Sequence, residues 1–154
     1  MNNLRNAREF CFQFFFHLQL PVFDSLKGEL QEEETHKLLS THISDFKEST
    51  NTLLDDKMNK FVIKQLSSCL KNYKDVEKVI SGNLKNWKIS RLSKVDHTIL
   101  ILAVNELCFT KAAPPKVIIN EAIELSKKFG SQESPSFING ILDSIAKKDP
   151  SNLR

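Results

Sequence analysis

The fold of this chain is decided by the stretch PPKVIINEAIELSKKFGSQESPSFINGILD, which occupies residues 114–143. Pro115 suits the first turn of a helix, because its missing N–H group would have no partner there. Lys127 and Lys128 come where the helix dipole favours cations, and Gly130 then provides a stop. These signals predict a helix from Pro115 to Lys128.

A second helix follows almost at once. Ser134 can cap its start and Pro135 suits its first position, which predicts a helix over 135–146. Gly140 lies inside this helix, where glycine costs roughly 1 kcal/mol relative to alanine. We therefore expect another backbone to approach closely at Gly140; close approach of a ligand is the alternative.

The rest of the chain is also helical in its pattern, and no stretch alternates at period two. The apolar spacing predicts seven helices, near 3–19, 28–49, 55–72, 74–84, 91–111, 115–128 and 135–146. The fifth helix is apolar on most sides, so we expect the others to surround it. The fold class is all-α, a compact bundle of about seven helices in a single domain over 1–154.

Charge divides the chain unevenly. The segment 24–56 has a net charge of −6, residues 57–154 have +8, and the whole chain has +3. A phosphate-bearing partner would use the basic region and avoid the acidic one. The alternative is an uneven decoration of a soluble surface. The segment 24–56 is also polar, and we expect it to be partly mobile.

Several function classes find no support in the sequence. Three cysteines, Cys11, Cys69 and Cys108, are far apart and lie in apolar patterns, which indicates reduced thiols in a cytoplasmic protein. No signal peptide, membrane-spanning run, metal-ligand spacing, phosphate-binding loop or nucleophile motif occurs. We expect no enzyme activity, no catalytic residues, no metal, no cofactor and no membrane partner.

The first helix presents two faces. A core stripe contains Leu4, Ala7, Cys11, Phe14, Phe15 and Leu18. The second face alternates guanidinium groups, from Arg5 and Arg8, with the rings of Phe12 and Phe16. Single-stranded nucleic acid binds such mixtures, because cations hold phosphates and rings stack on bases. The alternative is that Phe12 and Phe16 contact neighbouring helices while the arginines are solvated.

The third predicted helix has a lysine row. Lys57, Lys60 and Lys64 fall close together on the helical wheel, with Phe61 beside them. Most lysine rows are solvated faces, and that is the alternative here. If this face adjoins the arginines of the first helix, the two would form a track for phosphates.

A set of short blocks resembles a known family. The blocks are Asn-Ala-Arg-Glu at 6–9, Trp87, Arg91-Leu92, Val95-Asp96, Asn105-Glu106-Leu107, 120–125, 127–130 and 137–143. In this order they resemble the bacterial NusB family. The resemblance implies a transcription antitermination factor that binds single-stranded boxA-type RNA of ribosomal RNA leaders. It also implies that the factor acts with the ribosomal protein NusE and other Nus factors on elongating RNA polymerase.

The resemblance also implies an RNA surface. Arg5 and Arg8 match two arginine positions of the family, Glu133 an acidic position and Phe137 an aromatic one. The expected RNA-binding residues are Arg5, Arg8, Phe12, Lys57, Lys60, Lys64, Glu133, Phe137 and Asn139. Leu4 and Asn6 stand where relatives often carry arginine, so the basic cluster is thinner. The alternative function is a protein–protein adaptor or homodimer whose RNA binding is weak or lost.

Overall fold

The computed structural model describes residues 3–18, 32–85 and 88–148. Within these ranges every regular element is helical, which confirms the predicted all-α class. The α-helices are α1 (Asn3–Leu18), α2 (Glu32–Thr50), α3 (Asp56–Lys71), α4 (Tyr73–Ser81), α5 (Lys94–Asn105), α6 (Pro115–Phe129) and α7 (Ser134–Lys148). Two short turns, η2 (Ile89–Arg91) and η3 (Glu106–Thr110), flank α5. Trp87 and the residues expected to begin the second helix, 28–31, lie outside the described ranges.

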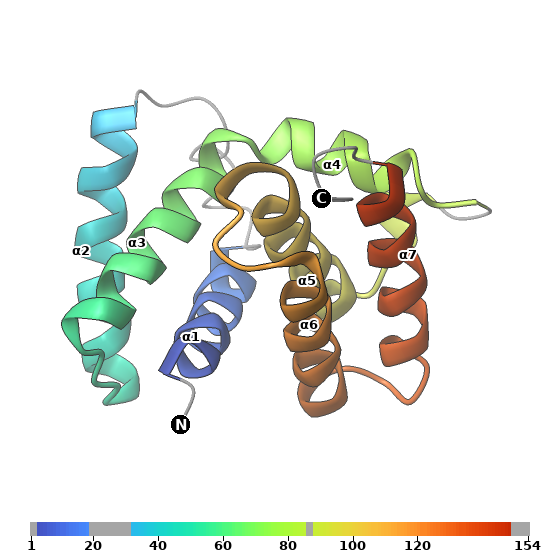
Figure 1. Cartoon of the computed structure of the whole chain (residues 1–154). Coiled ribbons are helices and arrows are strands. Elements are labelled where there is room, and N and C mark those ends of the chain that lie inside the picture. The colour runs from blue at the N-terminus through green and yellow to red at the C-terminus, as the bar shows by residue number, and fades with distance from the viewer. Residues whose placement is uncertain (1–2, 19–31, 86–87, 149–154) are drawn as a thin grey trace.

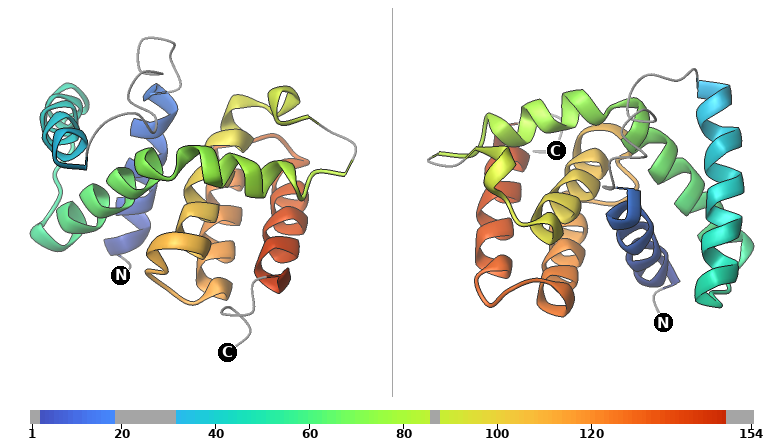
Figure 2. Two further views of the ribbon diagram at one scale, coloured as in Figure 1. Left: turned by 90° about the horizontal axis from the view of Figure 1, so that it is seen from above. Right: turned by 180° about the vertical axis from the view of Figure 1, so that it is seen from behind.

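The helices are arranged around α5. Figure 1 shows α3 and α4 running across one side, with α1, α5, α6 and α7 beneath them and α2 on the outer flank of α3; Figure 2 shows the same crossing from above. Helix α5 packs against α1, α3, α4, α6 and α7. Every residue from Thr98 to Leu107 is buried, which confirms the prediction for this segment.

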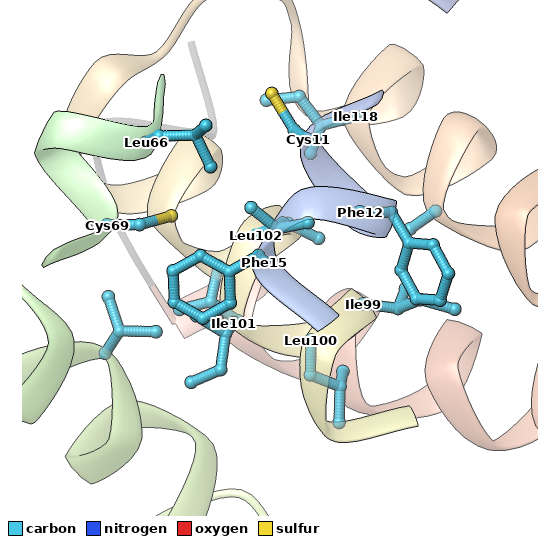
Figure 3. Close-up of a cluster of buried hydrophobic side chains, with 14 of the residues drawn as sticks. Cys11, Phe12, Phe15, Leu66, Cys69, Ile99, Leu100, Ile101, Leu102 and Ile118 are labelled. Carbon is cyan, nitrogen blue, oxygen red and sulfur yellow. The ribbon is translucent and has the colours of Figure 1, made fainter. Parts of the chain in front are cut away.

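Most of the core stripe predicted for α1 is buried; Leu4 is half-buried, and the side chain of Leu18 lies outside the described part of the chain. Ala7, Cys11, Phe14 and Phe15 are all buried. In Figure 3, Cys11 and Phe15 point into a cluster to which α3, α5 and α6 also contribute. The periodicity of the first helix therefore identified these four core positions, but not the burial of Arg8, Phe10 and Phe12 on its other sides.

Part of the acidic segment forms a packed helix. Leu39 and Ile43 of α2 are buried, and the Phe46 ring meets Phe10 and Phe14 edge to face, with centroids 5.5 and 5.4 Å apart. Aromatic pairs in this geometry add to the burial of their area. These contacts attach α2 to α1 within the bundle.

The segment predicted as one helix over 91–111 is divided in the structure. Ser93 interrupts it, because its hydroxyl accepts a hydrogen bond from the Asp96 N–H (3.1 Å) and caps a new helix there. After Asn105 the backbone widens into a π turn, and Lys111, with φ of 48°, ends it. Glu106 opens this π turn and is buried.

The α6–α7 corner is tightly closed. A Cβ atom at Gly130 would lie 2.6 Å from Ser134 Oγ and 2.8 Å from the Ser126 carbonyl oxygen, so only glycine fits. Ser134 Oγ accepts a hydrogen bond from the Ser131 N–H (3.0 Å), across the turn rather than as the predicted helix cap. The close approach expected at Gly140 is wrong: a Cβ there would meet nothing within 4 Å among the described residues.

Candidate nucleic-acid interface

Arg8 lies inside the protein. Its side chain reaches from α1 to Glu106 at the end of α5, with Nε 2.9 Å from Oε2 and Nη2 2.8 Å from Oε1. The guanidinium also lies 5.0 Å from the centroid of the Phe61 ring, and the residue is only 6% exposed. The expectation of a solvent-facing Arg8 is therefore wrong, because a buried carboxylate holds its charge.

The environment of Arg8 maintains that charge. Burial by itself lowers the pKa of Arg8, but the hydrogen bonds and the negative charge of Glu106 outweigh burial and raise the pKa above its ordinary value. The interior next to this pair is polar as well: Gln65 donates to the Leu102 carbonyl oxygen (3.0 Å), and Asn105 donates to Gln65 (3.2 Å). This set of buried polar groups joins α1, α3 and α5.

Phe12 is also an interior residue. It is 3% exposed, and its ring stacks on Phe129 of α6 with centroids 4.7 Å apart. Phe16 lies beside it, at 5.8 Å, and Figure 3 shows Phe12 among the buried side chains. The expected exposed position of Phe12 is thus wrong. Helix α6 covers Phe12 on the second face of α1, in agreement with the alternative that these rings contact neighbouring helices.

Arg5, one turn before Arg8, lies at the surface. Its side chain is 54% exposed, whereas that of its partner Glu121 is 5% exposed. Arg5 Nη2 is 2.8 Å and Nε 3.1 Å from Glu121 Oε2. These hydrogen bonds and the charge of Glu121 raise the pKa of Arg5. Arg5 is therefore fixed in place while much of its surface still faces solvent.

A groove of about 340 Å³ runs between α1 and α6, and we call it the α1/α6 groove. It is lined by Arg5, Arg8, Glu9, Glu121, Glu124, Leu125, Lys127 and Lys128. Lys128 Nζ is 2.6 Å from Glu9 Oε1, and Lys127 Nζ is 3.4 Å from Glu124 Oε1. The sequence identified these two lysines only as helix-terminal cations, and their spacing held no sign that α1 would lie beside them.

A second, shallower hollow of about 560 Å³ lies over α6, and we call it the α6/α7 hollow. Its lining includes Arg5, Lys116, Val117, Ile119, Asn120, Glu121, Ile123, Asn139 and Asp143. The Arg5–Glu121 pair thus borders both depressions. The structure brings Arg5 and the exposed Asn139 to one surface.

The remaining predicted residues lie on two other parts of the surface. Glu133 is exposed directly before α7, and Phe137 is half-buried one turn later. Lys57, Lys60 and Lys64 are exposed along α3. None of these three lysines lines the α1/α6 groove.

Other kinds of site find no support in the described part of the chain. No group of three or more His, Cys, Asp or Glu side chains there could hold a metal ion. Among the helices described, none has the length and apolar character needed to span a membrane. Burial raises the pKa of the Cys11 and Cys69 thiols well above the ordinary value, so both stay protonated and unreactive at neutral pH.

Comparison with known sequences places the chain in a family. The sequence profile of the NusB family matches residues 5–147. The transcription antitermination protein NusB of Clostridium novyi (strain NT) is 34% identical over 145 residues, which cover 94% of this chain and 98% of the relative. The NusB protein of Clostridium botulinum (strain Loch Maree / Type A3) is 39% identical over 142 residues, covering 91% and 96%.

Comparison with solved structures agrees. NusB from T. maritima superposes with a TM-score of 0.74 at 29% identity, over 96% of this chain and 92% of that one. A chain from a crystal structure of NusB and NusE with double-stranded RNA has the same fold, with a TM-score of 0.77 at 22% identity and coverage of 97% and 99%. The chain belongs to the NusB family, whose relatives named above are transcription antitermination proteins.

Proposed function

We propose that the protein is a non-catalytic transcription antitermination factor of the cytoplasm. It binds single-stranded boxA-type RNA of ribosomal RNA leaders together with NusE, and acts with other Nus factors on elongating RNA polymerase. Family membership supports the general role, and the solved complex of a fold relative with NusE and double-stranded RNA supports NusE and RNA as partners. The observation that carries the proposal is that Arg5 from α1 and Lys127 and Lys128 from α6 form a rim of cations, each paired with a carboxylate, on the α1/α6 groove.

The proposed RNA path begins at this rim. Arg5, Lys127 and Lys128 hold phosphates, and Asn139 binds a base or sugar in the adjoining hollow. Phe137 and Glu133 at the start of α7 contact the next nucleotide, the half-buried ring by stacking. Arg8 and Phe12 serve this surface from below: they fix α1 against α5 and α6, and so keep Arg5 in position.

The lysine row of α3 extends the path in this proposal. Lys57, Lys60 and Lys64 are exposed and lie on a helix that packs against α1. Cations on a separate surface give affinity through the backbone and little base discrimination. The row therefore compensates for the arginines that the N-terminus lacks.

A second candidate function is a protein–protein adaptor or homodimer with weak RNA binding. Phe109 of η3 and Val117 of α6, 40% and 42% exposed, favour it because a partner that covered them would remove apolar surface from water. Light scattering would distinguish the two. A dimer that neither RNA nor NusE dissociates or extends would support the second candidate.

The main test is fluorescence anisotropy with labelled boxA-type RNA, with and without NusE. We expect binding to the boxA-type sequence, tighter binding with NusE, and weaker binding to a scrambled sequence. Equal binding to both sequences under both conditions would reject the proposal.

The contribution of the lysine row is tested in the same assay. Removing one cation that binds a phosphate of single-stranded RNA lowers the salt slope by roughly 0.7, so K57Q/K60Q/K64Q should lower it by about 2. The variant K85Q/K88Q/K147Q removes the same charge elsewhere and is the matched control. An identical slope for the two variants would remove the row from the RNA path.

A further inference from the structure

The cations of the α1/α6 groove are matched one to one by carboxylates. Arg5 is paired with Glu121 (2.8 Å), Lys128 with Glu9 (2.6 Å) and Lys127 with Glu124 (3.4 Å). Arg8, which also borders the groove, is neutralised from the inside by Glu106. A groove that looks basic by its lysines and arginines is therefore close to neutral.

We propose that Glu9, Glu121 and Glu124 determine which RNA the α1/α6 groove accepts: they oppose attraction to any phosphate backbone and admit segments whose bases carry exocyclic amino groups. This inference rests on the proposed function and adds a selection rule to it. It makes these glutamates specificity residues, whereas Arg5, Lys127 and Lys128 supply affinity.

The first half of the rule follows from electrostatics. Non-specific affinity for nucleic acid comes mainly from unpaired cations that release counterions on binding phosphates. In this groove a phosphate must compete with a carboxylate already within hydrogen-bonding distance of each cation. A ligand that offers only phosphates therefore gains little, because it replaces one anionic partner by another.

The second half of the rule follows from the hydrogen-bond donors that a carboxylate needs when RNA takes or shares its cation. Carboxylates accept hydrogen bonds from the amino groups of cytosine, adenine and guanine, whereas uracil has no amino group and offers only its single ring N–H donor. A groove of about 340 Å³ is large enough for a nucleobase beside the side chains. An RNA segment with an amino-bearing base in the groove can donate a hydrogen bond to a carboxylate while its phosphate binds the cation. A uracil in the same place offers the carboxylate fewer donors.

The three glutamates differ in how readily they exchange partners. The side chains of Glu9 and Glu124 are 26% and 42% exposed, so water can replace the lysine when a phosphate takes it. Glu121 is 5% exposed and has little water to turn to, so it stays paired with Arg5, and a phosphate that binds Arg5 must share the guanidinium with it. Glu121 should therefore contribute most to selection, since it opposes phosphate binding at Arg5 continuously.

The test compares oligo(U), oligo(C) and boxA-type RNA across variants of the intact chain. E9Q/E121Q/E124Q removes the charges and keeps side-chain volume and one acceptor oxygen. We expect its affinity for oligo(U) to rise roughly fivefold per released cation at about 0.1 M salt, with the salt slope steeper by about 2. Affinity for boxA-type RNA and oligo(C) should rise less, so the ratio of these affinities to the affinity for oligo(U) should fall.

The control is E34Q/D45N/E48Q, which removes the same charge from the exposed side of α2. The inference would be overturned if the groove variant kept the original preference for boxA-type RNA and oligo(C) over oligo(U). It would also be overturned if the control variant changed that preference by the same factor. E9Q/E124Q, which leaves the buried Glu121 intact, repeats the test if the triple variant does not fold by circular dichroism. Failure of the unmutated protein to bind boxA-type RNA would instead reject the proposed function.

Discussion

Arg5 and Arg8 lie one turn apart on α1, and each holds a glutamate from the second half of the chain by short hydrogen bonds. Arg8 and Glu106 are both buried, whereas Arg5 is 54% exposed above a buried Glu121. The two pairs use the same chemistry in different surroundings. Their difference shows that burial, and not residue type, separates a structural arginine from one available to a ligand.

The energetic consequences of the two surroundings are opposite. Removing one partner of a buried pair leaves an uncompensated charge without water, which strongly destabilises a protein. Removing Arg5 also leaves a buried carboxylate, Glu121, but the Arg5 side chain is half exposed and water can enter the place that it leaves, so the cost is smaller. Arg8 should therefore determine stability, and Arg5 should determine binding.

The largest effect is expected for Arg8→Ala. It leaves Glu106 buried without its partner and should lower the free energy of unfolding by roughly 3–5 kcal/mol. Urea unfolding followed by circular dichroism measures this, with Arg5→Ala as the matched variant one turn away. The comparison fails if the two variants lose the same stability.

Much of the bundle could be predicted from the sequence. Local signals were strong for α6, where Pro115 and Gly130 lie at its two ends as expected. The apolar period of α1 also identified its core side. Such features depend on neighbours within a few residues, so a single sequence contains them. The break at Ser93 and the π turn after Asn105 were missed, because continuous apolar spacing concealed both.

The candidate site could be predicted only in part. A helical wheel places Arg5, Arg8 and Phe12 on one face, but it does not show how much of that face another helix covers. The cover comes from Phe129, which lies 117 positions after Phe12 in the sequence. Glu106 and Glu121 are likewise remote in sequence, and no local pattern links them to the arginines. Pairings of this kind are set by the packing of α1 against α5 and α6.

An intermediate effect is expected on cysteine reactivity. Cys11 lies beside Arg8 in a small cavity of about 20 Å³, and Cys69 is also buried, whereas Cys108 is half-buried. A disulfide reagent at about pH 8, near the ordinary thiol pKa, should modify Cys108 first in the native protein and reach the other two only after unfolding. Arg8→Ala should speed the labelling of Cys11, and Arg5→Ala should not. Equal rates in the two variants would mean that Arg8 does not seal this cavity.

The buried thiols of Cys11 and Cys69 make the free energy of unfolding depend on pH. Burial raises the pKa of Cys11 and Cys69, so the folded state keeps protons that the unfolded state loses. Their contribution is complete below the ordinary thiol pKa of about 8.5 and declines as pH rises above it. Between about pH 7 and about pH 10 the urea midpoint should therefore fall less in Cys11→Ala than in the unmutated protein. An equal fall in both would assign the pH dependence to other groups.

The smallest effect is expected for Arg5→Lys, and it separates charge from shape at the surface pair. Lysine keeps the positive charge but cannot make the two parallel hydrogen bonds that Arg5 makes to Glu121. If Arg5 acts on RNA as a phosphate-binding charge, the salt slope should stay unchanged in Arg5→Lys and fall by roughly 0.7 in Arg5→Ala. If both variants lose the same slope, the fixed orientation that Glu121 gives to the guanidinium is what RNA needs. In that case the exposed pair resembles the buried one: in both, the glutamate positions an arginine that charge alone cannot replace.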